Sequence, residues 1–272
     1  MTVPRDLTIA LLGVGKLGEA LLSGLLRSGR PAGSMLAAER YAERATEIAE
    51  RYGVLTPTPE EAAGSADVLL LAVKPQDMRA LLHAIAPHVR PETLVVSMAA
   101  GIPTALLEEL LPDGTVVVRV MTNTPVFVDE AMSAISAGSH AGAEHLQLVE
   151  DLLGPVGKVV RVPESQQDAV TALSGSGPAY FFFLVEAMID AGILLGLPRG
   201  VAAELIVQTA VGSARMLRES GEHPVLLREA VTSPGGTTIA AIRTMEDHGV
   251  RAAMLAAIEA ARDRSRELAA DA

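Results

Sequence analysis

Two stretches of this sequence combine residue types that suit the binding of an anion. Residues 13–18 have the spacing G-x-G-x-x-G, and residues 232–238 read Thr-Ser-Pro-Gly-Gly-Thr-Thr. Each stretch precedes a predicted helix, whose first N–H groups lack intrahelical acceptors and whose dipole favours negative charge. In the second stretch Thr237 or Thr238 is the expected N-cap. A plain turn between two helices is the structural alternative there, because Ser-Pro-Gly-Gly also punctuates helices.

The glycine-rich stretch has the context that gives it meaning. It follows a buried strand at residues 7–12 and opens a helix that runs to about Ser28. Gly13 is expected to make the tight turn, Gly15 to let a pyrophosphate approach, and Gly18 to let the helix pack on the strand. The sequence therefore predicts a dinucleotide site at this first strand–helix junction.

Two opposite charges follow the second predicted strand, residues 35–38. Glu39 stands where an acidic residue usually binds the ribose 2′-OH of NAD, whereas Arg40 could accommodate the 2′-phosphate of NADP. Arg44 lies one helical turn further on. A salt bridge between Glu39 and a neighbouring arginine is the structural alternative. The sequence leaves the choice between NADPH and NADH open.

Three further strands, predicted at residues 67–73, 93–97 and 115–119, each end in a turn. In an open parallel sheet the carboxyl ends of the strands form the ligand crevice. Lys74 and Asn123 follow two of these strands and are therefore candidate cofactor or substrate contacts. A lysine at a helix cap and an asparagine that shapes a turn are the structural alternatives.

The strand pattern ends at Pro163, after two last predicted strands at residues 131–137 and 156–162. We therefore expect an α/β, Rossmann-type dinucleotide-binding domain over residues 1–163 and an all-α dimerisation domain over residues 164–272. The helices predicted for the second domain are 165–173, 178–195, 198–220, 225–230, 238–247 and 250–270.

The helices that begin at Pro178 and Pro198 are apolar over most of their circumference. A helix that is hydrophobic all round is buried, and a domain of this size cannot bury so much surface by itself. Self-association through the helical domain is the expected consequence, with a dimer as the unit and larger assemblies open. A hydrophobic ligand tunnel is the rival explanation.

Composition narrows the class of protein. The formal net charge of −11 argues against nucleic acid and anionic membrane surfaces as partners. The absence of cysteine excludes disulfides and thiolate metal sites, and no metal is expected. Residues 1–7 do not resemble a secretory signal, and the apolar run 181–197 is interrupted by two acidic residues and looks too short to span a bilayer. A cytoplasmic protein without a membrane partner is expected.

The helical domain offers no obvious proton donor for a dehydrogenase. All three lysines precede it, and its only histidines, His223 and His248, lie in loop-like settings. A cyclic imine suits such a site, because it can be protonated in solution and then needs only hydride addition at carbon. The protein would have to orient the two rings and hold the other groups of the substrate.

With these features assembled, the chain resembles the pyrroline-5-carboxylate reductase family over essentially its whole length. The resemblance implies the reduction of L-1-pyrroline-5-carboxylate to L-proline, the last step of proline biosynthesis, with NADPH or NADH as cofactor. Reduction of a related imine or a 3-hydroxy acid, or nicotinamide sensing without turnover, are the alternatives. The motifs that carry the resemblance are residues 13–18, 72–75, 99–101, 121–125, 173–180, 196–198, 223–224 and 233–238.

The resemblance also assigns residues by position. It makes Thr238 the catalytic contact of the ring nitrogen, and it places the substrate carboxylate against the amides and hydroxyls of the 233–238 turn. At two places the sequence departs from the pattern of the family, namely at Pro59 and at the mixed Glu39–Arg40 pair. Both departures bear on cofactor preference only. The substrate residues are Ser176, Ser233, Gly235, Gly236, Thr237 and Thr238. The cofactor residues are Gly13, Val14, Gly15, Lys16, Leu17, Gly18, Arg40, Ala72, Val73, Lys74, Pro75, Met98, Ala99, Ala100 and Asn123.

Overall fold

The computed structural model describes residue 4 and residues 6–270. The prediction that no secretory signal is present was made from residues 1–7. Of these, residues 1–3 and 5 lie outside the described part. The chain forms two compact units, one up to Ser176 together with the residues from Ala261 on, and one over Gly177–Ala260. By contacts, residues 164–176 thus belong with the first unit, although the sequence pattern changes at Pro163.

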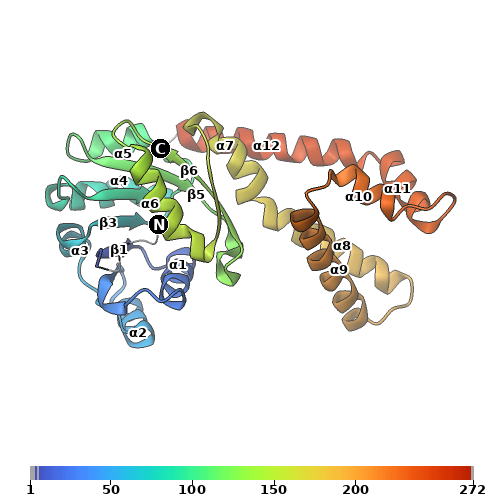
Figure 1. Ribbon diagram of the computed structural model, residues 1–272, viewed down its shortest axis with the longest axis horizontal. Helices are drawn as coiled ribbons and strands as arrows, with labels where there is room; N and C mark the ends of the chain where they lie inside the picture. Colours follow the sequence, from blue (N-terminus) through green and yellow to red (C-terminus); the bar gives the residue numbers. More distant parts are fainter. Residues whose placement is uncertain (1–3, 5, 271–272) are drawn as a thin grey trace. The chain divides into compact units, whose positions relative to one another are not determined.

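The first unit is built on a seven-stranded sheet in the order β2-β1-β3-β4-β5-β6-β7 (Figure 1). All neighbours are parallel except β5 and β6, which are antiparallel. The α/β class and all seven predicted strands are confirmed, with most strand ends shifted by one or two residues. The strands are β1 Ile9–Leu12, β2 Met35–Ala38, β3 Val68–Leu71, β4 Leu94–Ser97, β5 Val116–Met121, β6 Ala131–Ala137 and β7 Gly157–Arg161.

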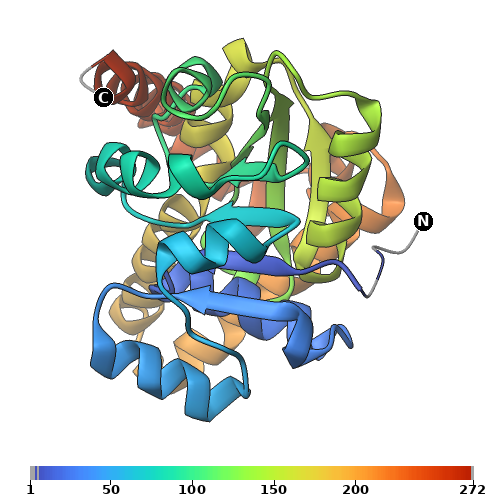
Figure 2. The ribbon, with the colours of Figure 1, turned by 90° about the vertical axis from the view of Figure 1, so that its left-hand side faces the viewer.

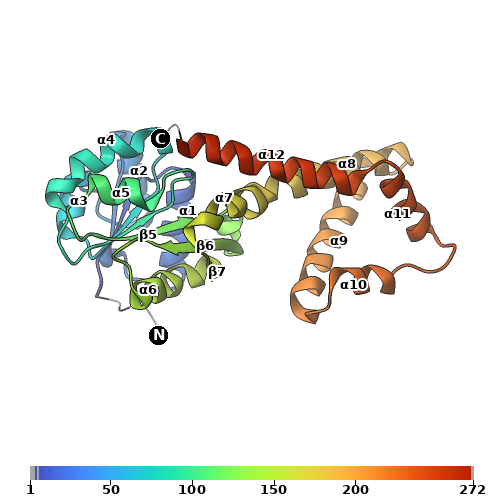
Figure 3. The same ribbon diagram turned by 90° about the horizontal axis from the view of Figure 1, so that it is seen from above.

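Helices cover both faces of this sheet, which is why its central strands are apolar without alternation. Figure 2 shows the sheet between its helical layers, and Figure 3 shows α3, α4 and α5 on one side of the sheet with α6 on the other. One layer consists of α1 Lys16–Arg27, α2 Ala42–Tyr52 and α6 Ala143–Leu153. The other consists of α3 Pro59–Ser65, α4 Pro75–Ile85 and α5 Thr104–Leu110.

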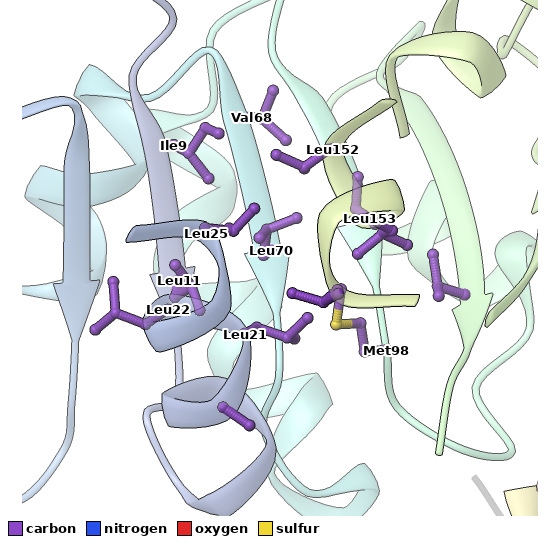
Figure 4. Packing of buried hydrophobic residues seen from close by; sticks show 14 of the residues in the cluster. Ile9, Leu11, Leu21, Leu22, Leu25, Val68, Leu70, Met98, Leu152 and Leu153 are labelled. Atoms are coloured by element: carbon purple, nitrogen blue, oxygen red, sulfur yellow. The ribbon is translucent and has the colours of Figure 1, made fainter. Parts of the chain in front are cut away.

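Each strand contributes alternate side chains to two separate hydrophobic clusters. Ile9 and Leu11 of β1 face α1, whereas Ala10 and Leu12 face the opposite layer. Figure 4 shows the first cluster, in which Leu21, Leu22 and Leu25 of α1 and Leu152 and Leu153 of α6 pack on the sheet. Because this packing fixes α1 against β1, it also fixes the glycine-rich loop between them.

The second unit is all helix, as predicted. A four-residue helix, α7 Gln167–Val170, and a π-helical turn, Thr171–Gly175, precede it in place of the single helix predicted at 165–173. A Cβ on Gly192 would lie 2.8 Å from the Cβ of Ala202, so α8 and α9 pack closely there. The helices are α8 Gly177–Leu194, α9 Arg199–Ser220, α10 Pro224–Ala230, α11 Thr237–Asp247 and α12 Val250–Ala270, whose last residues belong to the first unit.

Within the described residues one helical stretch, Glu164–Leu194, is long and apolar enough to cross a membrane by length and composition alone. The run at residues 181–197, which was predicted to be too short to span a bilayer, overlaps only the last part of this stretch. Core helices of soluble proteins have the same length and composition. The apolar surface of this stretch is largely exposed in a single chain. Exposed apolar surface of this extent indicates contact with another protein surface.

Candidate functional site

The carboxyl ends of β1, β2 and β3 surround a cleft of about 970 Å³ in the first unit. The strand order reverses there, since β2 lies beyond β1 on one side and β4 beyond β3 on the other. Open α/β sheets bind their ligands at such switch points. Six of the predicted cofactor residues line the cleft, namely Gly13, Gly15, Arg40, Ala72, Val73 and Lys74.

The glycine-rich loop is shaped to let a phosphate approach the backbone. Gly13 has a φ of 93°, and a Cβ there would lie 2.9 Å from Cγ1 of Val73. A Cβ on Gly18 would overlap the carbonyl oxygen of Gly13. Gly15 is the N-cap of α1 and has no heavy atom within 4 Å of its Cβ position. Open space over Gly15, at the start of a 12-residue helix, fits the pyrophosphate of a dinucleotide.

Two side chains hold the peptide groups of Val14 from either side of this loop. The backbone N–H of Val14 donates to Glu39 Oε2 at 3.0 Å, and Arg44 Nε donates to the carbonyl oxygen of Val14 at 3.4 Å. Arg44 also donates to Glu19 and, at 2.6 Å, to Glu47. Arg44 is therefore committed to the protein and is not placed to bind a 2′-phosphate.

Glu19 joins α1 to α2 beneath the loop. Its carboxylate accepts hydrogen bonds from Tyr52 Oη at 2.8 Å, from Arg51 Nη1 at 2.8 Å and from Arg44. Burial alone raises the pKa of Glu19, but the hydrogen bonds from Tyr52 and Arg44 and the charges of the two arginines outweigh it. The net pKa of Glu19 is therefore lowered.

Arg40 lies at the mouth of the cleft, as its place after β2 predicted. Its guanidinium carbon is 5.6 Å from the ring centroid of Tyr41, and its Nη1 is 3.8 Å from Oδ1 of Asp77 on α4. Asp77 and Tyr41 also line the cleft, and sequence reasoning did not select them. No local signal marks Asp77, because only the fold brings α4 opposite the end of β2.

The segment around the start of α3 is a second part of the cleft, of which sequence reasoning singled out only Pro59. Thr58 Oγ1 accepts from the N–H of Glu61 at 3.2 Å, and Glu61 Oε2 accepts from the N–H of Thr58 at 3.0 Å. Thr58, Pro59 and Glu60 all line the cleft. The sequence Thr-Pro-Glu-Glu is a capping-box signature, and it could have located this segment as a fixed wall.

A second cavity of about 730 Å³ lies in the same unit, at the carboxyl end of β4. It shares Gln76 with the first cleft. It brings together three predicted residues, Pro75, Ala100 and Ser176, although Ser176 follows Ala100 only after three more strands. Its other lining residues include Arg79, Thr171, Arg264 and Ser265, which carried no sequence signal.

Other predicted cofactor residues line neither cavity. Met98 and Ala99 are buried, and the side chains of Val14 and Leu17 belong to or pack against the first hydrophobic cluster. Lys16 is exposed at the start of α1 and Gly18 is packed against Gly13. The structure therefore does not bring these side chains together with those that line the cleft.

Asn123 uses both ends of its amide within the protein. Its Nδ2 donates to the carbonyl oxygen of Ser174 at 3.2 Å, and its Oδ1 accepts from the N–H of Met132 at 2.9 Å. Ser174 lies in the π-helical turn that leads to Ser176. The structure thus places Asn123 as a support for this turn.

The 233–238 turn lies in the second unit, between α10 and α11. Gly235 has a φ of 67°, and the N–H of Gly236 donates to the carbonyl oxygen of Ser233 at 3.1 Å. The N-cap of α11 is Gly236, so the prediction of a threonine N-cap was wrong, and Thr237 and Thr238 are the first helical residues. The free N–H groups of the first turn of α11 thus lie beside the hydroxyls of Thr237 and Thr238. This combination of donors suits the binding of a carboxylate.

Comparisons with known proteins agree over nearly the whole chain. Residues 164–268 match the family described as pyrroline-5-carboxylate reductase dimerisation, and residues 8–101 match the family described as NADP oxidoreductase, coenzyme F420-dependent. A pyrroline-5-carboxylate reductase of Corynebacterium melassecola is 46% identical over 265 residues, covering 96% of this chain and 98% of that protein.

Solved structures give the same result. A pyrroline-5-carboxylate reductase from Coxiella burnetii is 34% identical, with a TM-score of 0.90 over 96% of this chain and 98% of the other. The Plasmodium falciparum pyrroline carboxylate reductase, solved with NADP bound, is 27% identical, with a TM-score of 0.88 over 97% and 99% of the two chains.

Proposed function

The chain belongs to the pyrroline-5-carboxylate reductase family, and from this we infer that it reduces L-1-pyrroline-5-carboxylate to L-proline by hydride transfer from NAD(P)H. The similarity to reductases of one named activity at 46% identity over 96% of the chain carries this conclusion. A cleft at the switch point of the sheet and a glycine-rich turn at the start of α11 in the helical unit support it.

The test is a direct assay. Purified protein should oxidise NADPH or NADH when given pyrroline-5-carboxylate, which is followed by the loss of nicotinamide absorbance. A related cyclic imine without the carboxylate and a 3-hydroxy acid, assayed in the reverse direction, serve as comparison substrates. Turnover of either one with a higher kcat/KM than pyrroline-5-carboxylate would overturn the assignment.

The reaction needs few catalytic groups from the protein. When bound, the reduced nicotinamide supplies a hydride to the carbon of the C=N bond. Residues 164–272 contain no lysine, and we propose that the substrate enters as the iminium and already carries its proton. The residues of the chain then bind and orient the substrate, and they exclude water from the reacting centre.

We propose that the turn before α11 holds the substrate. The amides of Gly235, Gly236 and Thr237 would bind the carboxylate, with the Ser233 hydroxyl beside them, because the start of an 11-residue helix favours negative charge. The Thr238 hydroxyl would accept a hydrogen bond from the ring N–H and so hold the ring in one orientation. Ser176 would contribute from the cavity beside Ala100.

We propose that the cofactor lies along the carboxyl edge of β1, β3 and β4. Gly13 and Gly15 would receive the pyrophosphate, Arg40 the ribose end, and residues 72–75 and 98–100 the remaining length toward the nicotinamide. By function this divides the chain at Pro163 into a cofactor domain, 1–163, and a substrate and dimerisation domain, 164–272. The family match over residues 164–268 supports that division.

The helical part serves self-association, as the dimerisation family match indicates. We propose that the unit is a dimer, with larger assemblies left open, and that the exposed apolar side chains of α8 and α9 form its interface. Phe181, Phe182 and Phe183 are each about two-thirds exposed in the single chain. We place the enzyme in the cytoplasm, without nucleic-acid or membrane partners, since the net charge of −11 disfavours both surfaces.

A further inference from the structure

The charges around the nucleotide cleft are mostly acidic. A 2′-phosphate carries close to two negative charges near neutral pH, so its binding depends on how many cations face it and how free they are. Two cations, Arg40 and Lys74, line the cleft, and three carboxylates, Glu39, Glu60 and Asp77, stand among them.

Glu39 is fixed at the ribose end of this cleft. Its Oε2 accepts from the N–H of Val14 at 3.0 Å and its Oε1 accepts from the N–H of Tyr41 at 3.3 Å. Each carboxylate oxygen has a second lone pair, so Glu39 keeps the capacity to accept a ribose hydroxyl. The same oxygens repel a phosphate ester at that position.

Arg40 is the cation that remains for a 2′-phosphate at the end of β2, because Arg44 is engaged by Glu19 and Glu47. Its Nη1 lies 3.8 Å from Oδ1 of Asp77, beyond hydrogen-bond distance but close enough for the opposite charges to attract each other modestly. The pair joins the loop after β2 to the first turn of α4 across the mouth of the cleft. Asp77 therefore competes with any phosphate for Arg40.

We propose that Asp77 is a cofactor-selecting residue that weakens the binding of NADPH relative to NADH by partly neutralising Arg40. The inference rests on the proposed placement of the cofactor in this cleft. NADH has a free 2′-hydroxyl, which Glu39 can accept, and it gains nothing from Arg40. NADPH must draw Arg40 away from Asp77 and still lies beside both carboxylates.

Asp77→Asn keeps the size of the side chain and removes its charge. We expect the ratio of kcat/KM for NADPH to that for NADH to rise about three- to tenfold, as expected for one charge a few ångströms from an exposed dianion. The gain should shrink as salt is raised, because exposed charges are screened. A purely structural role for Asp77 would change both cofactors together and leave the ratio unaltered.

Glu92→Gln is a matched control. Glu92 also forms a loose surface pair, with its Oε1 3.7 Å from Nε of Arg90, and it lies just before β4 at the amino edge of the sheet. Its loss should leave the cofactor ratio unchanged. Arg40→Ala should lower the NADPH value alone, and in that background Asp77→Asn should lose most of its effect.

Equilibrium binding separates this inference from the proposed function. Adenosine 2′,5′-bisphosphate and 5′-AMP are the probes, titrated into wild type and Asp77→Asn by calorimetry. We expect the bisphosphate to bind about three- to tenfold more tightly to the variant and 5′-AMP to bind both equally. If both probes bind and the variant leaves their ratio unchanged, the role of Asp77 is wrong. If neither probe binds wild type, the cofactor site itself is misplaced.

Discussion

The two compact units differ in how much of their own surface they bury. The first has two hydrophobic clusters on either side of a sheet, and most of its strand residues are fully buried. In the second, every residue of which the structure describes, only Gly177 and Ala202 are buried. Apolar side chains that should form a core, such as Phe182 and Leu205, are more than half exposed.

Because of this difference, cofactor binding and substrate binding should have different physical requirements. The cleft that we propose for the cofactor is lined within one chain by strands and helices of one self-sufficient core. The turn that we propose for the substrate carboxylate stands on helices without a core of their own. Association must supply that core. Substrate turnover should therefore depend on protein concentration, whereas nucleotide binding should not.

Introducing a charge on α8 should abolish self-association and substrate turnover but leave nucleotide binding intact. For Phe182→Asp we expect a monomer and a loss of kcat/KM of more than about a hundredfold, because an unpaired charge cannot be buried in an apolar interface. Nucleotide affinity, measured by titration with 5′-AMP, should change less than about twofold. Light scattering after size exclusion gives the mass.

The control replaces an apolar residue of equal exposure on the first unit. Leu55 and Phe182 are both 68% exposed in the single chain. Leu55→Asp should leave the oligomeric mass unchanged. If Phe182→Asp kept its association and activity, the proposed interface on α8 would be wrong, and another face of the helical unit would have to be considered.

A substitution at the start of α11 should impair chemistry without touching association. For Thr238→Ala we expect kcat/KM to fall about ten- to a hundredfold, equivalent to about 1.4–2.7 kcal/mol. Thr244→Ala on the same helix is the control, because the Thr244 hydroxyl donates to the carbonyl oxygen of Ala240 at 3.1 Å. Steady-state kinetics distinguish them, and an unchanged kcat/KM for Thr238→Ala would contradict the role given to its hydroxyl.

Two glycines of the first unit should separate binding from stability. Gly15→Ala places a methyl group in open space over the backbone, so we expect an unchanged Tm and a Kd for NAD(P)H raised by about tenfold or more. Gly18→Ala places it against the carbonyl oxygen of Gly13, and overpacking of this kind costs about 1–3 kcal/mol. Thermal melts and nucleotide titrations of both variants measure the two effects. An equal loss of Tm in both variants would contradict the different roles given to Gly15 and Gly18.

The fold could be predicted from the sequence because its signals are local. Buried strands of a parallel sheet are apolar runs between turn residues, so β2 and β6 were located at their observed ends. The helices of the second unit are bounded by proline and glycine, and Pro224 and Gly221 mark two such ends. Residues 164–176 were harder, because Asn123, distant in sequence, supports the π-helical turn there.

The candidate site was only partly within reach of the sequence. Gly13, Gly15 and Lys74 were found because their motif or position relative to a strand is local. Asp77 and Ser265 were missed, since each meets its partner only after the chain has folded. The N-cap of α11 was misplaced by the general preference for threonine, whereas the turn at Gly235 already brings Gly236 into the extended conformation that a cap requires.

The smallest expected effect tests whether the first unit stands alone. Glu19 has a lowered pKa, so its ionised form stabilises the folded state at pH above its ordinary value. That contribution is lost as the pH falls through the lowered pKa. Near neutral pH we expect Glu19→Gln to reduce the free energy of opening α1 and α2 by about 1–2 kcal/mol, and in acid below that pKa to change nothing.

Hydrogen exchange of the α1 and α2 amides measures this opening, and Glu50→Gln on the exposed face of α2 is the control for lost charge. The reduction should be the same at low and high protein concentration, because Tyr52, Arg51 and Arg44 reach Glu19 within one chain. A dependence on concentration would mean that association also stabilises the first unit, and the contrast between the two units would then be one of degree.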